Sequence, residues 1–124
     1  IDAKDLKVDN KQFCAALNAE LSTGDAIEPP YDPLNNCGLY KPLTKARHNL
    51  GDAYWKAINP ARHKLPVCTD ATLNCGLAMH HVVLMNKKKD MDTIAAAVKK
   101  LVDNIDEVRK ITPGAIKKYQ ALSR

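Results

Sequence analysis

The four cysteines are the residues whose type and spacing offer the most chemistry in this 124-residue chain. Cys14, Cys37, Cys68 and Cys75 form an even set in a small chain, which predicts two disulfides and a secreted, extracellular protein. Four cysteines allow three pairings, and the sequence does not choose among them. Joining Cys14 to Cys75 and Cys37 to Cys68 is favoured, because Cys14 and Cys75 fall early in helices that would run parallel in a bundle. The local pairing, Cys14 with Cys37 and Cys68 with Cys75, stays open.

Nucleophilic catalysis finds little support in the sequence. Ser22 and Ser123 are the only serines, and neither lies in a Gly-x-Ser-x-Gly elbow. A cysteine nucleophile requires a free thiolate beside a histidine, which two disulfides would remove. We therefore predict no catalytic residue and a protein that is not an enzyme.

Metal and cofactor sites are also not indicated. His80 and His81 are adjacent, so on a helix their side chains would point about 100° apart and could not easily chelate one ion. The Asp90–Asp92 segment begins like a calcium loop but does not continue the pattern, and helix capping explains it better. There is no glycine-rich phosphate loop and no HExxH helix. We predict no metal and no cofactor.

The elements that would position these residues begin with a well-specified helix over residues 10–22. Asp9 suits the N-cap and Gln12 falls at the third helical position, which is the spacing of a capping box. Val8 and Phe13 occupy the two positions of a hydrophobic staple.

A proline-rich, extended connection follows over residues 25–40. Four further helices are predicted over residues 42–58, 71–86, 94–108 and 113–122. The third predicted helix, which Asp70 would cap, is apolar on much of its circumference and is expected at the centre of the bundle. The clearest stripe spans Ile94 to Val108, with apolar residues spaced by four and three. The expected fold is all-α: one domain, residues 1–124, in a compact bundle of four to five helices with two disulfides.

The net charge of +5 lies entirely in the last third of the chain. Residues 1–85 carry nine basic and nine acidic side chains, whereas residues 86–124 carry ten basic and five acidic ones. Such a field favours acidic partners, so polyanions are a further candidate ligand. No membrane span is expected, and no nucleic acid partner. The predicted partner-binding residues are Lys87, Lys88, Lys89, Lys99, Lys100, Arg109 and Lys110.

The sequence also resembles a known family, the small secreted salivary proteins of anopheline mosquitoes typified by anophensin and albicin. The resemblance rests on Phe13–Leu17, on Asn36–Leu39, and on Cys68 and Cys75 ahead of a basic helical part. It implies a non-catalytic, anticoagulant or complement-inhibiting protein of saliva. The implied partners are host plasma proteins or protease complexes, namely the alternative complement pathway convertase or the contact (kallikrein–kinin) system.

The alternative function is a helical carrier of a small hydrophobic ligand, similar in format to insect odorant-binding proteins. Their closely spaced cysteines in the third helix region differ from the spacing found here. An internal apolar cavity would favour the carrier, and a solid core would count against it.

Overall fold

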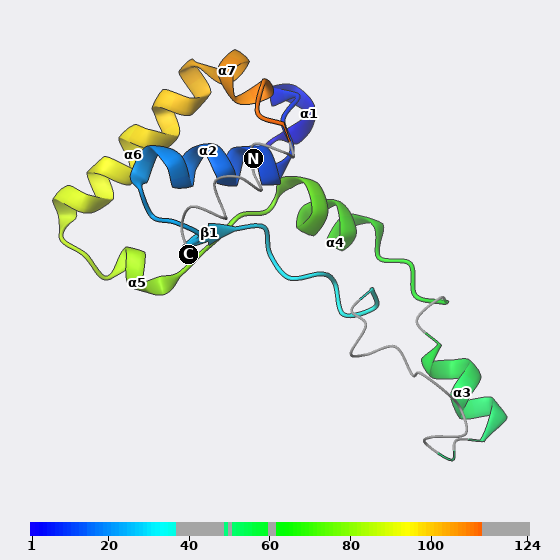
Figure 1. Ribbon diagram of the computed structural model, residues 1–124. Coiled ribbons are helices and arrows are strands. Elements are labelled where there is room, and N and C mark those ends of the chain that lie inside the picture. Colours follow the sequence, from blue (N-terminus) through cyan, green and yellow to red (C-terminus); the bar gives the residue numbers. More distant parts are fainter. Residues whose placement is uncertain (37–48, 50, 60–61, 113–124) are drawn as a thin grey trace.

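The second helix organises the fold. The computed structural model describes residues 1–36, 49, 51–59 and 62–112. These residues are mostly helical, with one small two-stranded sheet (Figure 1). The elements are α1 (Ala3–Leu6), α2 (Asn10–Leu21), β1 (Ile27–Glu28), α3 (Asp52–Ile58), α4 (Pro66–Asp70), the π-helical turn η4 (Ala71–Cys75), β2 (Ala78–Met79), α5 (His81–Leu84), α6 (Lys88–Asp103) and α7 (Ile105–Arg109).

Helix α2 starts as the sequence predicts. The carboxylate of Asp9 accepts a hydrogen bond from the backbone N–H of Gln12 at 2.8 Å, and the Gln12 side-chain oxygen accepts one from the Asp9 N–H at 3.2 Å. Val8 and Phe13 are both buried in the core, as a hydrophobic staple requires. The capping box and the staple are therefore confirmed.

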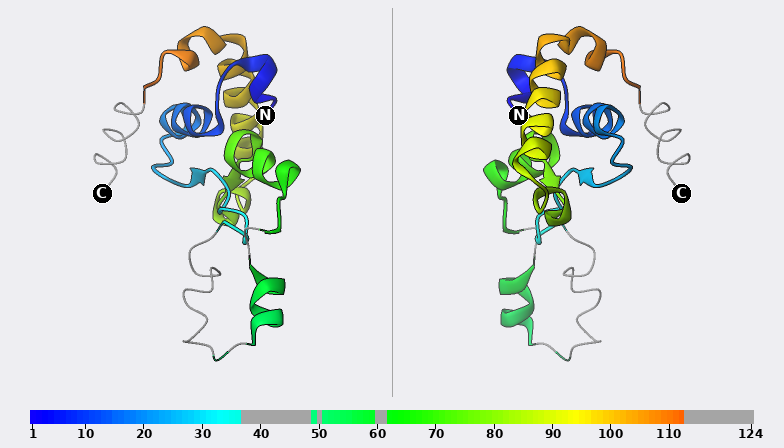
Figure 2. Two further views of the ribbon diagram at one scale, coloured as in Figure 1. Left: turned by 90° about the vertical axis from the view of Figure 1, so that its right-hand side faces the viewer. Right: turned by 90° about the vertical axis from the view of Figure 1, so that its left-hand side faces the viewer.

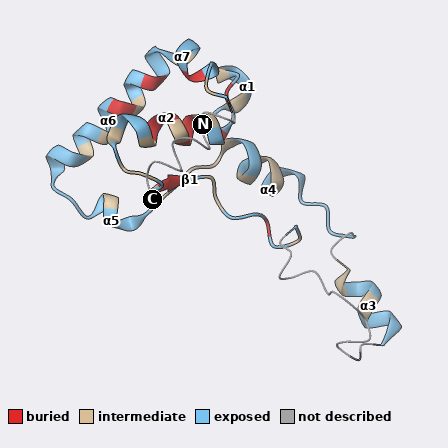
Figure 3. Ribbon diagram, viewed as in Figure 1, coloured by how far each residue is buried: buried red, intermediate tan, exposed pale blue. Residues whose placement is uncertain are grey.

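The core is a single cluster centred on α2, which packs against β1, α6 and α7 (Figure 3). Helices α6 and α7 present the apolar stripe that the spacing predicted, with Leu101 and Val108 buried. The stripe is carried by two helices, because the backbone leaves the helical conformation at Asn104. The buried apolar residues are Val8, Phe13, Cys14, Ala16, Leu17, Ile27, Ala97, Leu101 and Val108.

The predicted helix over 71–86 is wrong. That segment forms the turn η4, the strand β2 and the short helix α5, and none of these three elements has a buried residue. Asp70 has helical backbone angles inside a helical run and makes no side-chain cap. The apolar composition did not indicate a central helix, because the centre of this fold is α2.

The small sheet corrects the all-α prediction. Strands β1 and β2 pair antiparallel, with Ile27 opposite Met79. The side chain of Asn18 on α2 holds β1 in place: its amide donates to the Ile27 carbonyl at 2.6 Å, and its oxygen accepts from the Ile27 N–H at 3.1 Å. Pairing with a strand some fifty residues away turns part of the predicted extended connection into a strand.

The described residues between 29 and 65, here called the arm, leave the rest of the chain as a long projection (Figures 1 and 2). It carries α3, which has no buried residue. Tyr54 on this helix is 59% exposed. The bundle is therefore not compact throughout. The first part of the predicted helix over 42–58 and all of the predicted helix over 113–122 lie outside the described residues. The single-domain assignment stays a prediction.

Candidate functional site

The described cysteines are free thiols, which contradicts the predicted disulfides. Cys14 is buried in the core, Cys75 is half-buried and Cys68 is exposed. One of the pairings considered above requires a bond between Cys14 and Cys75, and the other a bond between Cys68 and Cys75. Neither bond is present, so both pairings are wrong. Cys37 lies outside the described residues.

Cys14 is a poor nucleophile in this position. Burial raises the pKa of its thiol to about 12, and the negative charges of Glu28 and Asp9 add to the shift. A thiol with such a pKa is almost entirely protonated at neutral pH, and only the thiolate attacks or binds metal. Cys14 therefore serves as an apolar side chain of the core.

A hollow of about 500 Å³ lies where α1 and the start of α2 meet η4. The residues that line it include the charged Asp2, Lys4, Lys7, Asp9 and Asp70. The hollow is open to solvent and carries these charges, so it is not the internal apolar cavity that the carrier requires.

The carboxylates of the hollow already have structural partners. Asp2 caps α1 by accepting from the backbone N–H groups of Lys4 and Asp5 at 3.1 Å. Asp70 accepts from the Asn74 amide at 2.6 Å. These carboxylates hold helix ends and turns in place, and their arrangement does not indicate acid–base catalysis.

Asn10 links α2 to the π-helical turn. Its side chain is completely buried, and its amide nitrogen donates to the carbonyl oxygens of Thr72 at 2.9 Å and of Gly76 at 3.0 Å. A π-helical turn leaves backbone carbonyls without the usual helical partners, so one amide satisfies two of them. Asn10 therefore fixes the turn from which the chain enters β2.

The base of the arm meets the same turn. A Cβ atom on Gly76 would lie 2.7 Å from the Ala71 carbonyl oxygen and 2.7 Å from Cγ of Pro30, so only glycine fits between them. The backbone N–H of His80 donates to the Ala26 carbonyl at 3.0 Å, which continues the pairing of β1 with β2. The projection thus starts from a closely packed base.

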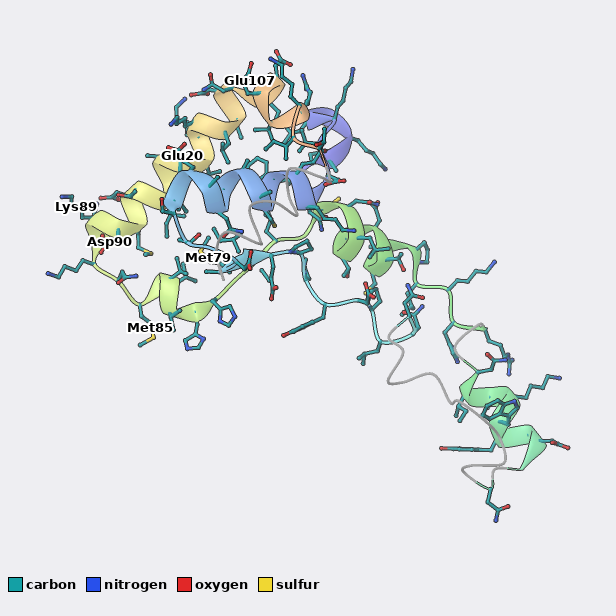
Figure 4. All side chains as sticks on the ribbon, in the orientation of Figure 1. Glu20, Met79, Met85, Lys89, Asp90 and Glu107 are labelled. Carbon is teal, nitrogen blue, oxygen red and sulfur yellow. The ribbon has the colours of Figure 1, made fainter. Side chains whose placement is uncertain are left out.

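Most of the predicted partner-binding cations are neutralised locally. Lys88, Lys99, Lys100, Arg109 and Lys110 form ion pairs with Asp92, Asp103, Glu20, Asp106 and Glu107 respectively. Figure 4 labels two of the acidic partners, Glu20 on α2, which pairs with Lys100, and Glu107 on α7, which pairs with Lys110. Such pairs reduce the field that a partner would meet, although Lys87 and Lys89 add positive charge at the start of α6. Partner binding by these residues stays a prediction.

The histidine pair, metal ligands and membrane spans considered from the sequence can be checked in the described part of the chain. The rings of His80 and His81 have centroids 6.4 Å apart and are tilted by 44° to each other. No group of three or more potential metal ligands occurs among residues 1–36, 49, 51–59 and 62–112. Within the same residues, no helix combines the length and the apolar composition that crossing a bilayer requires.

Sequence reasoning missed the contacts that organise this region. Asn10 reads as an ordinary residue in the first turn of a helix, and nothing in its neighbours signals two carbonyls more than sixty residues away. The Pro29–Pro30 pair did indicate a break in regular structure, but not that Pro30 would pack against Gly76.

Comparison with known proteins points in one direction. No family model matches the chain, and no solved structure gives a significant match. The chain is 43% identical over 94 residues to an L-glutamine:2-deoxy-scyllo-inosose aminotransferase of Streptoalloteichus tenebrarius, covering 76% of this chain and 22% of that protein. It is 40% identical over 87 residues to the enzyme of the same name in Streptomyces fradiae, covering 70% and 20%. An L-glutamine:scyllo-inosose aminotransferase of Streptomyces griseus is 32% identical over 100 residues, covering 81% and 23%.

These similarities overturn the salivary interpretation. The chain resembles bacterial aminotransferases, so the mosquito family, the inhibitor of complement or contact activation and the host plasma partners are wrong. The carrier is wrong for the same reason, and so is the assignment as a non-enzyme, because the relatives are named as enzymes. The short motifs that carried the resemblance held no reactive or ligand-binding pattern. The chain spans about a fifth of the length of these relatives. The extracellular location stays a prediction.

Proposed function

We propose that the polypeptide carrying this sequence is an aminotransferase that takes its amino group from L-glutamine and gives it to a cyclic polyhydroxy ketone. The observation that carries this proposal is the 43% identity over 94 residues to a protein named for that reaction. Relatives named for 2-deoxy-scyllo-inosose and for scyllo-inosose both match. The two acceptors share a ketone on a six-membered ring that carries several hydroxyl groups, so this is the substrate class we infer.

The exposed surface of the structure favours a segment that packs within a larger protein over a unit that folds and works alone. Large apolar side chains are exposed on the arm, on α4 and just after α5, among them Tyr31, Val67 and Met85 respectively. Apolar surface of this extent is typical of regions that pack against further protein. Since Asp2, Asp9 and Asp70 make local structural contacts and Cys14 is a core group, we assign this segment a role in building the enzyme and its contacts.

The reaction itself has a simple balance. The C–N bond at the α-carbon of glutamine breaks and that carbon becomes a ketone, while the ring ketone of the acceptor becomes a carbon that bears an amine. The side-chain amide of glutamine is not altered in such a transfer. Labelling the two nitrogens separately therefore tests the proposal directly.

The test uses the complete polypeptide that contains residues 1–124, purified and incubated with either acceptor. With L-glutamine labelled with ¹⁵N at the α-amino group, mass spectrometry should detect an aminated ring that carries the label. Glutamine labelled at the amide nitrogen is the matched control and should give an unlabelled product. Folded protein that forms no aminated ring from either acceptor would overturn the proposal. Label arriving from the amide nitrogen would instead indicate an amidotransferase.

A further inference from the structure

The hollow beside α1 is lined by charges of both signs, which come from different elements. In Figure 1 the start of α2 lies between α1 above it and the end of α4 below it, where η4 begins. Lys4 and Lys7 belong to α1 and its C-terminal cap, whereas Asp70 and Asn74 belong to the end of α4 and to η4. The volume of about 500 Å³ lies within the roughly 300–1,000 Å³ typical of small-molecule sites.

The two lysines of the hollow have no anionic partner in the part of the chain that the structure describes. The ion pairs between described residues all involve other cations, on α6 and α7. Lys4 and Lys7 are exposed, so their ammonium groups are accessible to a ligand. An ammonium group binds a carboxylate through charge-assisted hydrogen bonds, which are stronger than neutral ones.

The carboxylates of the hollow still have oxygens that can accept hydrogen bonds. Asp2 and Asp9 cap their helices through Oδ1 alone, and their Oδ2 atoms accept no hydrogen bond from a described residue. Asp70 is half-buried, and its Oδ2 lies 4.0 Å from Sγ of Cys75, which is a weak donor. A ligand with a stronger donor would replace that contact at little cost.

We infer that the hollow binds a free α-amino acid, with the α-carboxylate against Lys4 and Lys7 and the α-ammonium group against Asp70. A simple anion would meet three carboxylates, and a simple cation would meet two ammonium groups. A molecule that carries both charges on neighbouring atoms satisfies both sides of the hollow. Ala3 and the buried Val8 add apolar wall for methylene groups.

L-Glutamine is the probe for this site, because it is the proposed amino donor. The site itself is inferred from the wall of the hollow and does not rest on the aminotransferase reaction. The two proposals can therefore fail separately: a polypeptide that forms no aminated ring could still bind L-glutamine here.

The first experiment uses Cys75 to report occupancy. Cys75 lines the hollow and is half-buried, whereas Cys68 on α4 is exposed and does not line it. The complete polypeptide that contains residues 1–124 is treated with iodoacetamide, and peptide mass spectrometry gives the labelling rate of each thiol. L-Glutamine should slow the labelling of Cys75 several-fold and leave Cys68 unchanged. An unchanged rate at Cys75, or equal slowing at both thiols, would overturn the proposal.

Two analogues of L-glutamine test the two charges separately. Glutaramate lacks the α-ammonium group, and γ-aminobutyramide lacks the α-carboxylate. Each should require an about fivefold higher concentration than L-glutamine to slow the labelling of Cys75 equally, which is the effect of losing one partly exposed ion pair. An analogue that protects Cys75 as well as L-glutamine does would contradict the inferred pairing of charges.

A pair of variants locates the binding. Lys7→Glu replaces attraction of the α-carboxylate by repulsion and should raise the protecting concentration of L-glutamine by at least about fivefold. Lys11 is also exposed but does not line the hollow, so Lys11→Glu should behave as the wild type. If Cys75 does not react in the folded polypeptide, equilibrium dialysis with radiolabelled L-glutamine decides. Lys7→Glu should then bind one molecule fewer per polypeptide than Lys11→Glu, and equal binding would overturn the proposal.

Discussion

Replacing Asn10 with alanine tests the link between α2 and the π-helical turn. The buried Asn10 amide donates to the carbonyl oxygens of Thr72 and Gly76, at 2.9 and 3.0 Å. Alanine cannot donate, so both carbonyls would lose the amide of Asn10, which is fully buried, at two residues that are themselves half-buried. The same contacts position the turn at the base of the arm.

The size of the effect follows from these contacts. Stranding a buried polar group costs about 1–3 kcal/mol, so two carbonyls cost about 2–6 kcal/mol. The Asn10 side-chain oxygen has no hydrogen-bond partner among the described residues, and removing it returns about 1–2 kcal/mol. We therefore expect Asn10→Ala to lower the free energy of unfolding by about 1–4 kcal/mol, a substantial share of the about 5–15 kcal/mol typical of a domain.

The assay is urea unfolding followed by far-ultraviolet circular dichroism. Asn74→Ala is the matched control: it also removes an amide, but an exposed one that donates to Asp70, and it should change stability by less than about 0.5 kcal/mol. If Asn10→Ala were as mild as Asn74→Ala, the two hydrogen bonds would not support the fold.

Asn10→Asp tests the direction in which stability should change with pH. A buried carboxylate would face two carbonyl oxygens, so its folded-state pKa would be raised, and the variant should be more stable near pH 4 than at pH 7.

Three further predictions follow from burial and close contact. Gly76→Ala should destabilise by about 1–3 kcal/mol in thermal or urea unfolding, because its Cβ would overlap a carbonyl oxygen and a proline ring; Gly51→Ala, with nothing within 4 Å, should not. Phe13→Ala should cost about 3–5 kcal/mol in the same assay, since its ring is 1% exposed; a loss below about 1 kcal/mol would show that the core can collapse around the gap. The raised pKa of Cys14 predicts that folded protein at pH 8 reacts with a thiol reagent at Cys68 but not at Cys14, and that stability falls as pH rises from about 9 to about 12; rapid labelling of both thiols would contradict this.

The sequence predicted the local signals well. The start of α2 is encoded by neighbours three to five residues apart, so Asp9, Gln12, Val8 and Phe13 could be read without knowledge of the rest of the fold. The apolar spacing from Ile94 to Val108 likewise identified the face of α6 and α7 that packs on α2. Both signals are periodic or local, which is why they survive in the folded chain.

The contacts of the candidate site could not be read in this way. Asn10 acts on carbonyls more than sixty residues away, and Pro30 and Gly76 come from segments far apart in the sequence. The apolar segment over 71–86 was predicted as one central helix, but Ala78–Met79 found a strand partner in β1 and the remainder became short turns. A run of apolar residues does not show which remote segment of the chain it will pack or pair with.

The sequence by itself determined where helix α2 begins and which face of α6 and α7 is buried, because capping and periodicity act over a few residues. The tertiary structure decided that the described cysteines stay reduced, that a strand pair and a π-helical turn interrupt the apolar segment, and that the arm projects instead of folding back. The physical reason is distance. Disulfides, strand pairs and buried amides depend on which remote segments meet, and a single sequence carries no direct signal for that.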